Sequence, residues 1–245
     1  MIRLIKYLIY LSILTALILF FTPLNLYYQY LEKDLRPVKL EGISGSIIKG
    51  QSEKISYMGM DLGQAEWLAY PNSWKSLLVE LKVEDQDYDI RADIEQNLRR
   101  QNFKNVRGTL DWNVIKKYAN FNRGEISGYL SLDFSEISIQ EGVPERMNGS
   151  IETGELKLIS PLKKDLGTIK VDFNSDSPGF IVGTVNSDSH VLNVSGAIYI
   201  HKNHRWEVKL NIIPKPGEYE LEYALQGIGN PRPGGGRSFN LAGFY

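Results

Sequence analysis

Apolar and polar side chains alternate with a period of two along most of the chain. In residues 205–212 every second side chain is apolar, beginning with Trp206 and ending with Ile212. Residues 219–225 repeat the pattern with glutamates at most of the intervening positions, and residues 214–217 contain the Pro and Gly of a turn. A strand with one buried and one solvated face has this period, so the two runs predict a β-hairpin.

The same alternation recurs upstream, with one interruption. Apolar side chains occupy alternate positions in residues 169–173 and 192–200. In residues 130–134 the apolar positions are even-numbered, whereas Ile137 begins an odd-numbered run. A shift of one residue would turn the buried face toward solvent, so we predict a β-bulge, bend or tight turn at residues 135–136.

These strands recur about every ten residues, between clusters of Gly, Asn, Asp and Pro. The rhythm indicates a mainly β domain with an extended, curved antiparallel sheet, folded over or sandwich-like, and at most one or two short helices. Asp111 before an apolar stripe is typical of a helix N-cap, and we leave that segment open between helix and strand. Residues 94–100 are open between a helical turn and a loop. The glycine-rich residues 227–237 predict a loop before a last strand, 238–245.

Glycine precedes a short apolar alternation at several places, including residues 126–132, 147–151 and 194–200. Glycine lacks a Cβ atom and accepts positive φ, so it fits a tight turn or a crowded bend where a strand begins. We interpret these glycines as structural, with ligand binding as the alternative.

No charged side chain lies between Lys6 and Glu32. Residues 7–31 would form a helix of about 37 Å at about 1.5 Å per residue, long enough to cross a hydrocarbon core of roughly 30 Å. The segment has no small-residue cleavage pattern, so it predicts an uncleaved signal anchor, and the tyrosines around Tyr28 fit a membrane interface. We therefore divide the chain into a cytoplasmic stub with a transmembrane anchor, residues 1–31, and a β-rich domain, residues 32–245.

The charges that flank this segment predict its orientation. Arg3 and Lys6 lie on its short side, whereas positive and negative side chains cancel just beyond its other end. Basic residues favour the cytoplasmic side, so we expect the N-terminus in the cytoplasm and the C-terminal domain in the periplasm. The expected localisation is the cell inner membrane, crossed once.

The chain has 28 basic and 29 acidic side chains and no cysteine. A nucleic-acid-binding protein needs a basic face, so this balance argues against nucleic acid as a partner. Without cysteine, neither a disulfide scaffold nor a thiolate metal site can form, and an apolar core must hold the domain together.

Candidate reactive groups are few and poorly arranged. His201 and His204 have the spacing of metal ligands on a helix, but they flank a predicted turn without a cluster of carboxylates. Residues 187–190, Ser-Asp-Ser-His, contain the residue types of a catalytic triad, but neighbouring residues of a strand point to opposite faces. We interpret the first as turn histidines on the surface and the second as a solvated hairpin loop.

Two further patterns have the composition of ion sites. The acidic run Glu84, Asp85, Asp87 and Asp89 lacks the glycine and terminal glutamate of a calcium loop, which favours a charged strand edge. The glycines of residues 234–236 before Arg237 suit an anion-binding nest, but no strand–loop–helix context accompanies them. We therefore predict no catalytic, metal or cofactor-binding residues and do not expect an enzyme.

The residues after the predicted anchor resemble a known family. Pro23-Leu24-Asn25-Leu26, the glycine-rich residues 40–50, and Leu62-Gly63 followed by Trp67 and Pro71 are similar to type II secretion system protein N. Residues 124–132 and 195–200 fit the same pattern more loosely, whereas residues 49–51 and 99–101 depart from it. The resemblance implies an inner-membrane component of the machine that exports folded proteins from the periplasm and, more distantly, an AsmA-like envelope protein.

The resemblance transfers no catalytic residue and leaves two functions open. The first is a non-catalytic secretion component whose periplasmic β domain contacts other secretion subunits. The second is an AsmA-like lipid-binding, lipid-transfer or tether protein with an apolar groove, for which lipid is a partner. A packed interior favours the first and a groove wide enough for an acyl chain favours the second. In both, we expect the apolar face that includes Trp206, Val208, Tyr219 and Leu221 to line the curved sheet.

Overall fold

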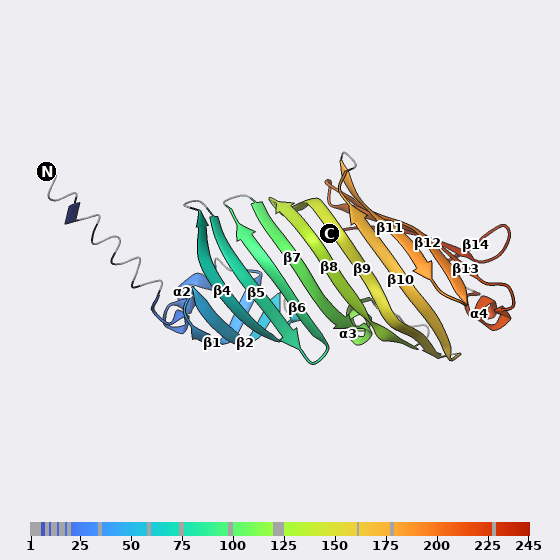
Figure 1. The fold of residues 1–245 in the computed structure, drawn as a ribbon, viewed down its shortest axis with the longest axis horizontal. Helices are drawn as coiled ribbons and strands as arrows, with labels where there is room; N and C mark the ends of the chain where they lie inside the picture. The colour runs from blue at the N-terminus through green and yellow to red at the C-terminus, as the bar shows by residue number, and fades with distance from the viewer. Residues whose placement is uncertain are drawn as a thin grey trace. The chain divides into compact units, whose positions relative to one another are not determined.

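The computed structural model describes residues 6–7, 10, 14, 18, 21–33, 36–57, 60–73, 76–97, 100–119, 125–160, 162–176, 179–226 and 229–245. Their contacts divide the chain into two compact units, the N-terminal unit Met1–Gln86 and the C-terminal unit Asp87–Tyr245. Each unit contains antiparallel β-strands and few short helices (Figure 1). The prediction of a mainly β, antiparallel chain is therefore confirmed, while the predicted division at residue 31 stays a prediction.

The N-terminal unit contains strands β1 (Val38–Gly45), β2 (Lys49–Tyr57), β3 (Met60–Asp61), β4 (Gln64–Ser73) and β5 (Ser76–Asp85). Their order in the sheet is β1-β2-β4-β5, with β3 paired to β2, and these pairings are antiparallel. Trp67 lies over its register partner Gly50, and its indole N–H donates to the carbonyl of Ser46 at 3.1 Å. The indole thus fills the space that a side chain at Gly50 would need.

The predicted anchor, residues 7–31, lies partly outside the described residues. Those described before Thr22 are helical, and Thr22 donates its backbone N–H and its hydroxyl to the carbonyl of Ile18, at 2.8 and 2.6 Å. After Pro23 the chain continues as a 3₁₀ turn, η1 (Leu24–Leu26), and a short helix, α2 (Tyr28–Leu31). An uninterrupted helix as far as residue 31 is therefore wrong, because proline cannot continue a helix. No helix among the described residues is long and apolar enough to cross a membrane.

The residues beyond Pro23 pack against β1. Leu24 is 6% exposed, and the hydroxyl of Tyr28 accepts a hydrogen bond from the backbone N–H of Leu40 at 2.7 Å. Because β1 ends the sheet order of this unit, Tyr28 satisfies a donor on the outer side of an edge strand.

The C-terminal unit is a meander of long strands: β6 (Tyr88–Gln96), β7 (Arg100–Asp111), β8 (Glu125–Gln140), β9 (Val143–Ser160), β10 (Lys164–Asn174), β11 (Phe180–Asp188), β12 (Leu192–His201), β13 (Arg205–Pro214), β14 (Asn230–Pro231) and β15 (Arg237–Phe244). Successive strands are antiparallel neighbours from β6 to β13; β15 then pairs with β13, and β14 with β15. Helix α3 (Trp112–Ala119) follows β7, and helix α4 (Tyr219–Ala224) follows β13 (Figure 1). The predicted last strand is confirmed as β15, whereas the described part of the predicted loop before it contains the two-residue strand β14.

The predicted irregularity at residues 135–136 is confirmed as a β-bulge in β8. Phe134 pairs with Gly149 and Glu136 pairs with Asn148, so Ser135 is the extra residue. Phe134 and Ile137 consequently pack in the same buried cluster despite their opposite parity. The bulge therefore keeps the buried face of the strand continuous.

The segment after Asp111, left open between helix and strand, forms helix α3. The carboxylate of Asp111 accepts a hydrogen bond from the backbone N–H of Asn113 at 2.8 Å, as an N-cap residue does. Trp112 packs against buried side chains of the sheet. Residues 94–100, also left open, contain the end of β6 and the start of β7, where Asn97 donates its N–H to the carbonyl of Arg100 at 2.9 Å.

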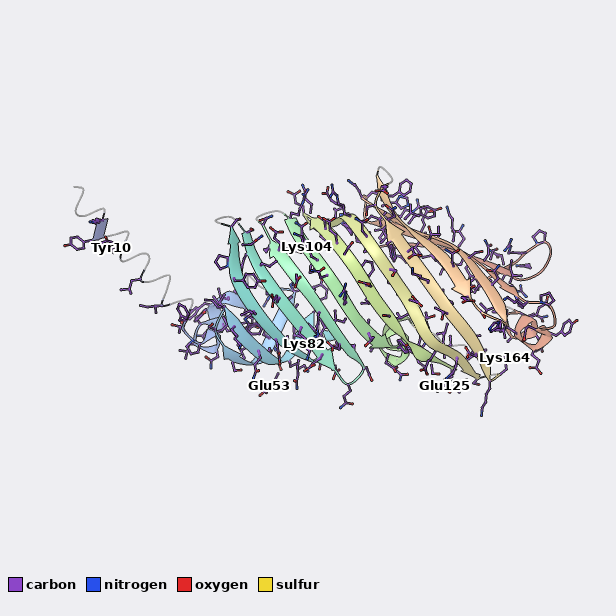
Figure 2. All side chains as sticks on the ribbon, in the orientation of Figure 1. Tyr10, Glu53, Lys82, Lys104, Glu125 and Lys164 are labelled. Carbon is purple, nitrogen blue, oxygen red and sulfur yellow. The ribbon has the colours of Figure 1, made fainter. Side chains whose placement is uncertain are left out.

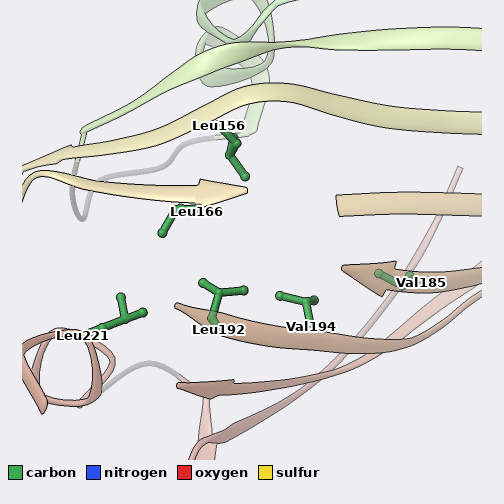
Figure 3. Close-up of a cluster of buried hydrophobic side chains, with 6 residues drawn as sticks. All are labelled: Leu156, Leu166, Val185, Leu192, Val194 and Leu221. Carbon is green, nitrogen blue, oxygen red and sulfur yellow. The ribbon is translucent and has the colours of Figure 1, made fainter. Parts of the chain in front are cut away.

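Two clusters of buried apolar side chains form the core of the C-terminal unit. The first is built around Leu156, Leu166, Val185, Leu192, Val194 and Leu221 (Figure 3). The second is built around Val106, Phe134, Phe173 and Ile181. Val171 and Ile198 pack against both clusters, so the apolar face runs without interruption from one to the other. Burial of this face, at about 25 cal/mol per Å² of apolar surface, is the main stabilising contribution.

The predicted second strand of the late hairpin, residues 219–225, is wrong. The segment forms α4, and β15 is the strand that pairs with β13. Leu221 is 3% exposed and Leu225 packs in the same cluster, whereas Tyr219 and Tyr223 are 78% and 74% exposed. Leu221 and Leu225 are four positions apart, so they share a helix face as readily as a strand face. Tyr219 therefore does not belong to the apolar face of the sheet.

Two of the glycines predicted to open strands lie inside them instead, Gly149 in β9 and Gly196 in β12. Their φ values are +151° and +156°. A Cβ atom at Gly149 would collide with the carbonyl oxygen of Asp133, and one at Gly196 with that of Lys209. These contacts support the structural interpretation of the glycine pattern.

Candidate functional site

The histidines singled out by their spacing lie on either side of the turn between β12 and β13. The His201 ring lies 6.4 Å from the ring of Tyr199, whereas the His204 ring lies 5.3 Å from the ring of Tyr245. His201 Nε2 is buried and lies 3.7 Å from Glu207 Oε1, beyond hydrogen-bond distance. Among the residues that the structure describes, no group of three or more His, Cys, Asp or Glu side chains could hold a metal ion. His201 thus packs against the rings of Phe180 and Tyr199, and His204 packs against that of Tyr245.

The serines of the triad-like run bond to backbone groups of their own turn. Ser187 Oγ accepts a hydrogen bond from the N–H of Val194 at 2.7 Å, and Ser189 Oγ accepts one from the N–H of Leu192 at 3.3 Å. His190 is exposed, whereas Ser189 is only 5% exposed. The turn between β11 and β12 is confirmed, but it is less solvated than predicted because Ser189 is buried.

The acidic run is divided between the two units. In the N-terminal unit, Glu84 forms an ion pair with Lys82 of its own strand. In the C-terminal unit, Asp89 lies 3.3 Å from the guanidinium of Arg91, also on its own strand. Glu84 and Asp89 thus each have a neighbouring cation, which favours charged strand ends over a calcium loop.

The glycines of residues 234–236 lie in the turn between β14 and β15. The N–H of Gly235 donates to the carbonyl of Arg232 at 3.2 Å, and the N–H of Arg232 donates to the carbonyl of Gly236 at 3.3 Å. These hydrogen bonds belong to a turn, and a turn explains the glycines without invoking a bound anion.

A pocket of about 300 Å³ lies in the C-terminal unit, where the start of β9, the start of β11 and the turn after β12 meet. It is lined by Pro144, Glu145, Arg146, Ser175, Asp176, Gly179, Phe180, Ile181 and Lys202. Glu145 lies 3.1 Å from Arg100 and 3.8 Å from Lys202, so it links two cations at the rim. Charged side chains of both signs suit this pocket to a small polar molecule rather than to an acyl chain.

The polar face of β13 carries cations around one carboxylate. Glu207 lies 3.0 Å from both Arg205 and Lys209, and its side chain is 17% exposed. The hydrogen bond from Lys209 holds the pKa of Glu207 below its ordinary value, helped by the positive charges of Lys209 and Arg205 and opposed by burial. Glu207 therefore remains ionised at neutral pH and compensates the cations around it.

An ion pair fastens helix α4 to the sheet. Lys164, labelled beside α4 in Figure 2, donates from its ammonium group to the carboxylate of Glu218 at 2.7 Å. This hydrogen bond raises the pKa of Lys164 above its ordinary value. The pair holds the N-terminal end of α4 against β10 and leaves the tyrosines of the helix in solvent.

The edge strand β15 is a surface that the sequence analysis missed. It pairs with β13 along its length, but β14 covers only Arg237 and Ser238 on its other side. Leu241 and Phe244 are 55% and 79% exposed. The signal was present, because residues 238–245 form an apolar strand without a charged side chain at the edge of a predicted sheet.

The described part of the chain is thus a β-sheet protein whose candidate sites are surfaces: an apolar face, a charged face and a sheet edge. The family model of Type II secretion system (T2SS), protein N, matches residues 36–240, and the chain belongs to that family. The resemblance seen in the sequence is confirmed. No curated protein and no solved structure matches the chain significantly.

Proposed function

We propose that this protein is a non-catalytic inner-membrane component of a type II secretion system, with a periplasmic β region that contacts other secretion subunits. The observation that carries the proposal is the family match over residues 36–240, which includes strands of both units. The surfaces described above support a role in binding, since each presents side chains or backbone groups that a protein partner can engage.

The membrane arrangement is part of this proposal. Residues 7–31 anchor the chain, with Arg3 and Lys6 on the cytoplasmic side and residues 32–245 in the periplasm. The described apolar side chains of the segment favour contact with lipid, because Leu14, Ile18 and Phe21 are 55%, 57% and 70% exposed. A fusion of alkaline phosphatase after Tyr245 should be active, because that enzyme folds only in the periplasm. An inactive phosphatase fusion together with a fluorescent cytoplasmic reporter at the same position would contradict the arrangement.

The secretion role is tested by deleting the gene and following a substrate of the secretion system. We expect the substrate to accumulate in the periplasm and the full chain, supplied from a plasmid, to restore its release. The tagged chain should also co-purify with other secretion subunits from solubilised membranes. Normal secretion after deletion, combined with no co-purified subunit, would contradict the proposal.

A second candidate, a lipid carrier or tether, is favoured by one observation. The apolar face is continuous through Val171 and Ile198, and the cluster around Phe134 and Phe173 consists of strand residues alone, with no helix over it among the described residues. A photoactivatable fatty acid should then label peptides of this face in the purified full chain. Labelling confined to the predicted anchor, with no co-purified lipid seen by native mass spectrometry, would exclude the second function.

A further inference from the structure

The outer side of β15 carries backbone groups without a strand partner in the described part of the chain. Tyr245 donates its N–H to the carbonyl of His204 at 3.0 Å, on the β13 side. Hydrogen-bonding directions alternate along an antiparallel strand, so the N–H and C=O groups of Asn240, Ala242 and Phe244 point away from β13. Ser238, which has the same parity, pairs with β14 on that outer side.

This edge lacks the features with which proteins usually protect an edge strand. Residues 238–245 contain no charged side chain and no proline. The edge strand β1 of the N-terminal unit is different: it carries the ion pair of Lys39 and Glu41 at 2.7 Å, and Tyr28 occupies the N–H of Leu40. An unprotected edge is a template for another strand, so the end of β15 from Asn240 onward is open to pairing.

We propose that this edge binds the same edge of a second copy of the chain, in an antiparallel pairing about a two-fold axis at Ala242. In that register Ala242 faces Ala242 of the second copy, and Asn240 faces Phe244 of the second copy. Each outward N–H group then faces a C=O group of the second copy and can donate a hydrogen bond to it, because the outward residues are spaced symmetrically around Ala242.

The side chains of β15 suit this self-pairing. Leu241, which is 55% exposed, falls opposite Gly243 of the second copy. A Cβ atom at Gly243 would lie 2.6 Å from Cζ2 of Trp206, so the indole of Trp206 lies over this glycine. Leu241 of the second copy can therefore pack against the indole. No charged side chain faces another across the pair, since the strand has none in the paired region.

The pairing is expected to be weak in solution. A short pair of strands buries less than the roughly 1,000 Å² of total accessible surface typical of a specific interface. The association therefore depends on concentration and calls for a test that captures it covalently. It does not depend on the secretion role, so its failure and the failure of the proposed function are separate results.

The absence of native cysteine makes covalent capture direct. In a hydrogen-bonded antiparallel pair the Cα atoms are about 5.5 Å apart, within the roughly 4.4–6.8 Å that a disulfide spans. The full chain with Ala242→Cys, oxidised in detergent micelles, should give a disulfide-linked dimer. The matched control is Thr184→Cys, because Thr184 is exposed but its strand, β11, pairs with β10 and β12 on both sides. Equal yields of dimer from the two variants would overturn the proposal.

A substitution at the axis tests the pairing without oxidation. Ala242→Pro removes one outward N–H and leaves the β13 ladder intact, whereas Ala242→Ser keeps the N–H. By sedimentation of the full chain over a range of concentrations, the wild type and Ala242→Ser should dimerise, and Ala242→Pro should associate roughly tenfold more weakly. If Ala242→Pro also melts at a lower temperature, Asn240→Lys takes its place as a charged edge.

Two further results would overturn the proposal. The first is a wild-type chain that stays monomeric at all concentrations. The second is an Ala242→Cys variant that cross-links in cells to a different secretion subunit and not to another copy of itself.

Discussion

The rings of Phe134 and Phe173 meet across the strand that separates them, with their centroids 5.8 Å apart and their planes inclined at 41°. Gly149 of β9 is the register partner of both residues, Phe134 in β8 and Phe173 in β10. Because Gly149 has no side chain, the two rings close over it and form the centre of the second core cluster. The same relation of an aromatic residue to a facing glycine recurs at Trp206 and Gly243.

Replacing Gly149 with alanine should destabilise the C-terminal unit by more than its unusual backbone alone explains. The φ value of +151° already disfavours a side chain, and the new Cβ would lie 2.8 Å from Cδ1 of Phe134 and would collide with the carbonyl of Asp133. We expect Gly149→Ala to lower the free energy of unfolding by about 1–3 kcal/mol, measured by denaturant titration.

Gly142→Ala is the control for this change. Gly142 also has positive φ, +82°, but a Cβ atom there would have nothing within 4 Å. The difference between the two variants measures the contacts of the new Cβ atom with the carbonyl of Asp133 and with Phe134, apart from the strain of a positive φ. Equal destabilisation by the two substitutions would show that these contacts add nothing to the backbone strain.

Helix α4 and a strand at the same residues would bury different side chains, so substitutions in this segment distinguish the two structures. Leu221→Ala should destabilise the protein by about 2–5 kcal/mol, because Leu221 is buried in the first core cluster. Tyr219→Ala and Tyr223→Ala should change stability by less than about 0.5 kcal/mol, because both rings are in solvent. Thermal unfolding of the three variants distinguishes the structures, since in a strand all three side chains would share the buried face.

The sequence predicted the secondary structure of a segment correctly where only a helix or only a strand fitted its pattern of apolar and polar side chains. In residues 205–214 the charged side chains all occupy odd-numbered positions. A helix cannot place the alternating apolar side chains together on one buried face, and the strand was predicted correctly. In residues 219–225 the spacing of Leu221 and Leu225 satisfies both periods, and the tertiary contact with the first core cluster decides for the helix. The β-bulge at Ser135 was predictable because only an extra residue reconciles the parity of Phe134 with that of Ile137.

The surfaces were less predictable than the strands. The meeting of Phe134 and Phe173 requires the register of three strands, which no local pattern contains. The open edge of β15 depends on β14 being only two residues long, which no local pattern predicts. The roles of Ser187 and Ser189 also follow from the turn geometry, since each hydroxyl accepts from a backbone N–H that the pattern does not identify.

The N-cap of α3 should contribute a measurable part of the stability of the segment between β7 and β8. Asp111→Ala removes the acceptor for the N–H of Asn113, and we expect a loss of about 1 kcal/mol in the free energy of unfolding. Asp111→Asn is the matched control, because an amide oxygen can still cap the helix. The prediction fails if the alanine and asparagine variants unfold at the same denaturant concentration.

The stability contributed by Glu207 should depend on pH in one direction. Its pKa in the folded protein lies below the ordinary value of 4.5, first because of the hydrogen bond from Lys209. Glu207→Gln should therefore melt at a lower temperature than the wild type at neutral pH. The difference should shrink as the pH falls from about 4.5 through the lower folded value, where the wild-type carboxylate also takes up a proton.

Glu220→Gln is the control for this pH series, because Glu220 is exposed on α4. Its melting temperature should follow that of the wild type over the whole range. A constant gap between wild type and Glu207→Gln from neutral to acidic pH would mean that the side chain acts through its shape rather than through its charge.

The proposed membrane anchor can be tested with one substitution on each side of Pro23. Leu14→Arg places a charge near the middle of the apolar helix and should cost about 2.5–3.5 kcal/mol of insertion free energy. Leu26→Arg is the matched control, because Leu26 lies in η1 beyond Pro23 and is 65% exposed. Carbonate extraction of membranes should release a large share of Leu14→Arg into the soluble fraction and leave Leu26→Arg in the pellet. If both variants stay in the pellet as the wild type does, Leu14 does not lie in the hydrocarbon core as the proposed anchor, residues 7–31, requires, and another part of the chain must hold the protein to the membrane.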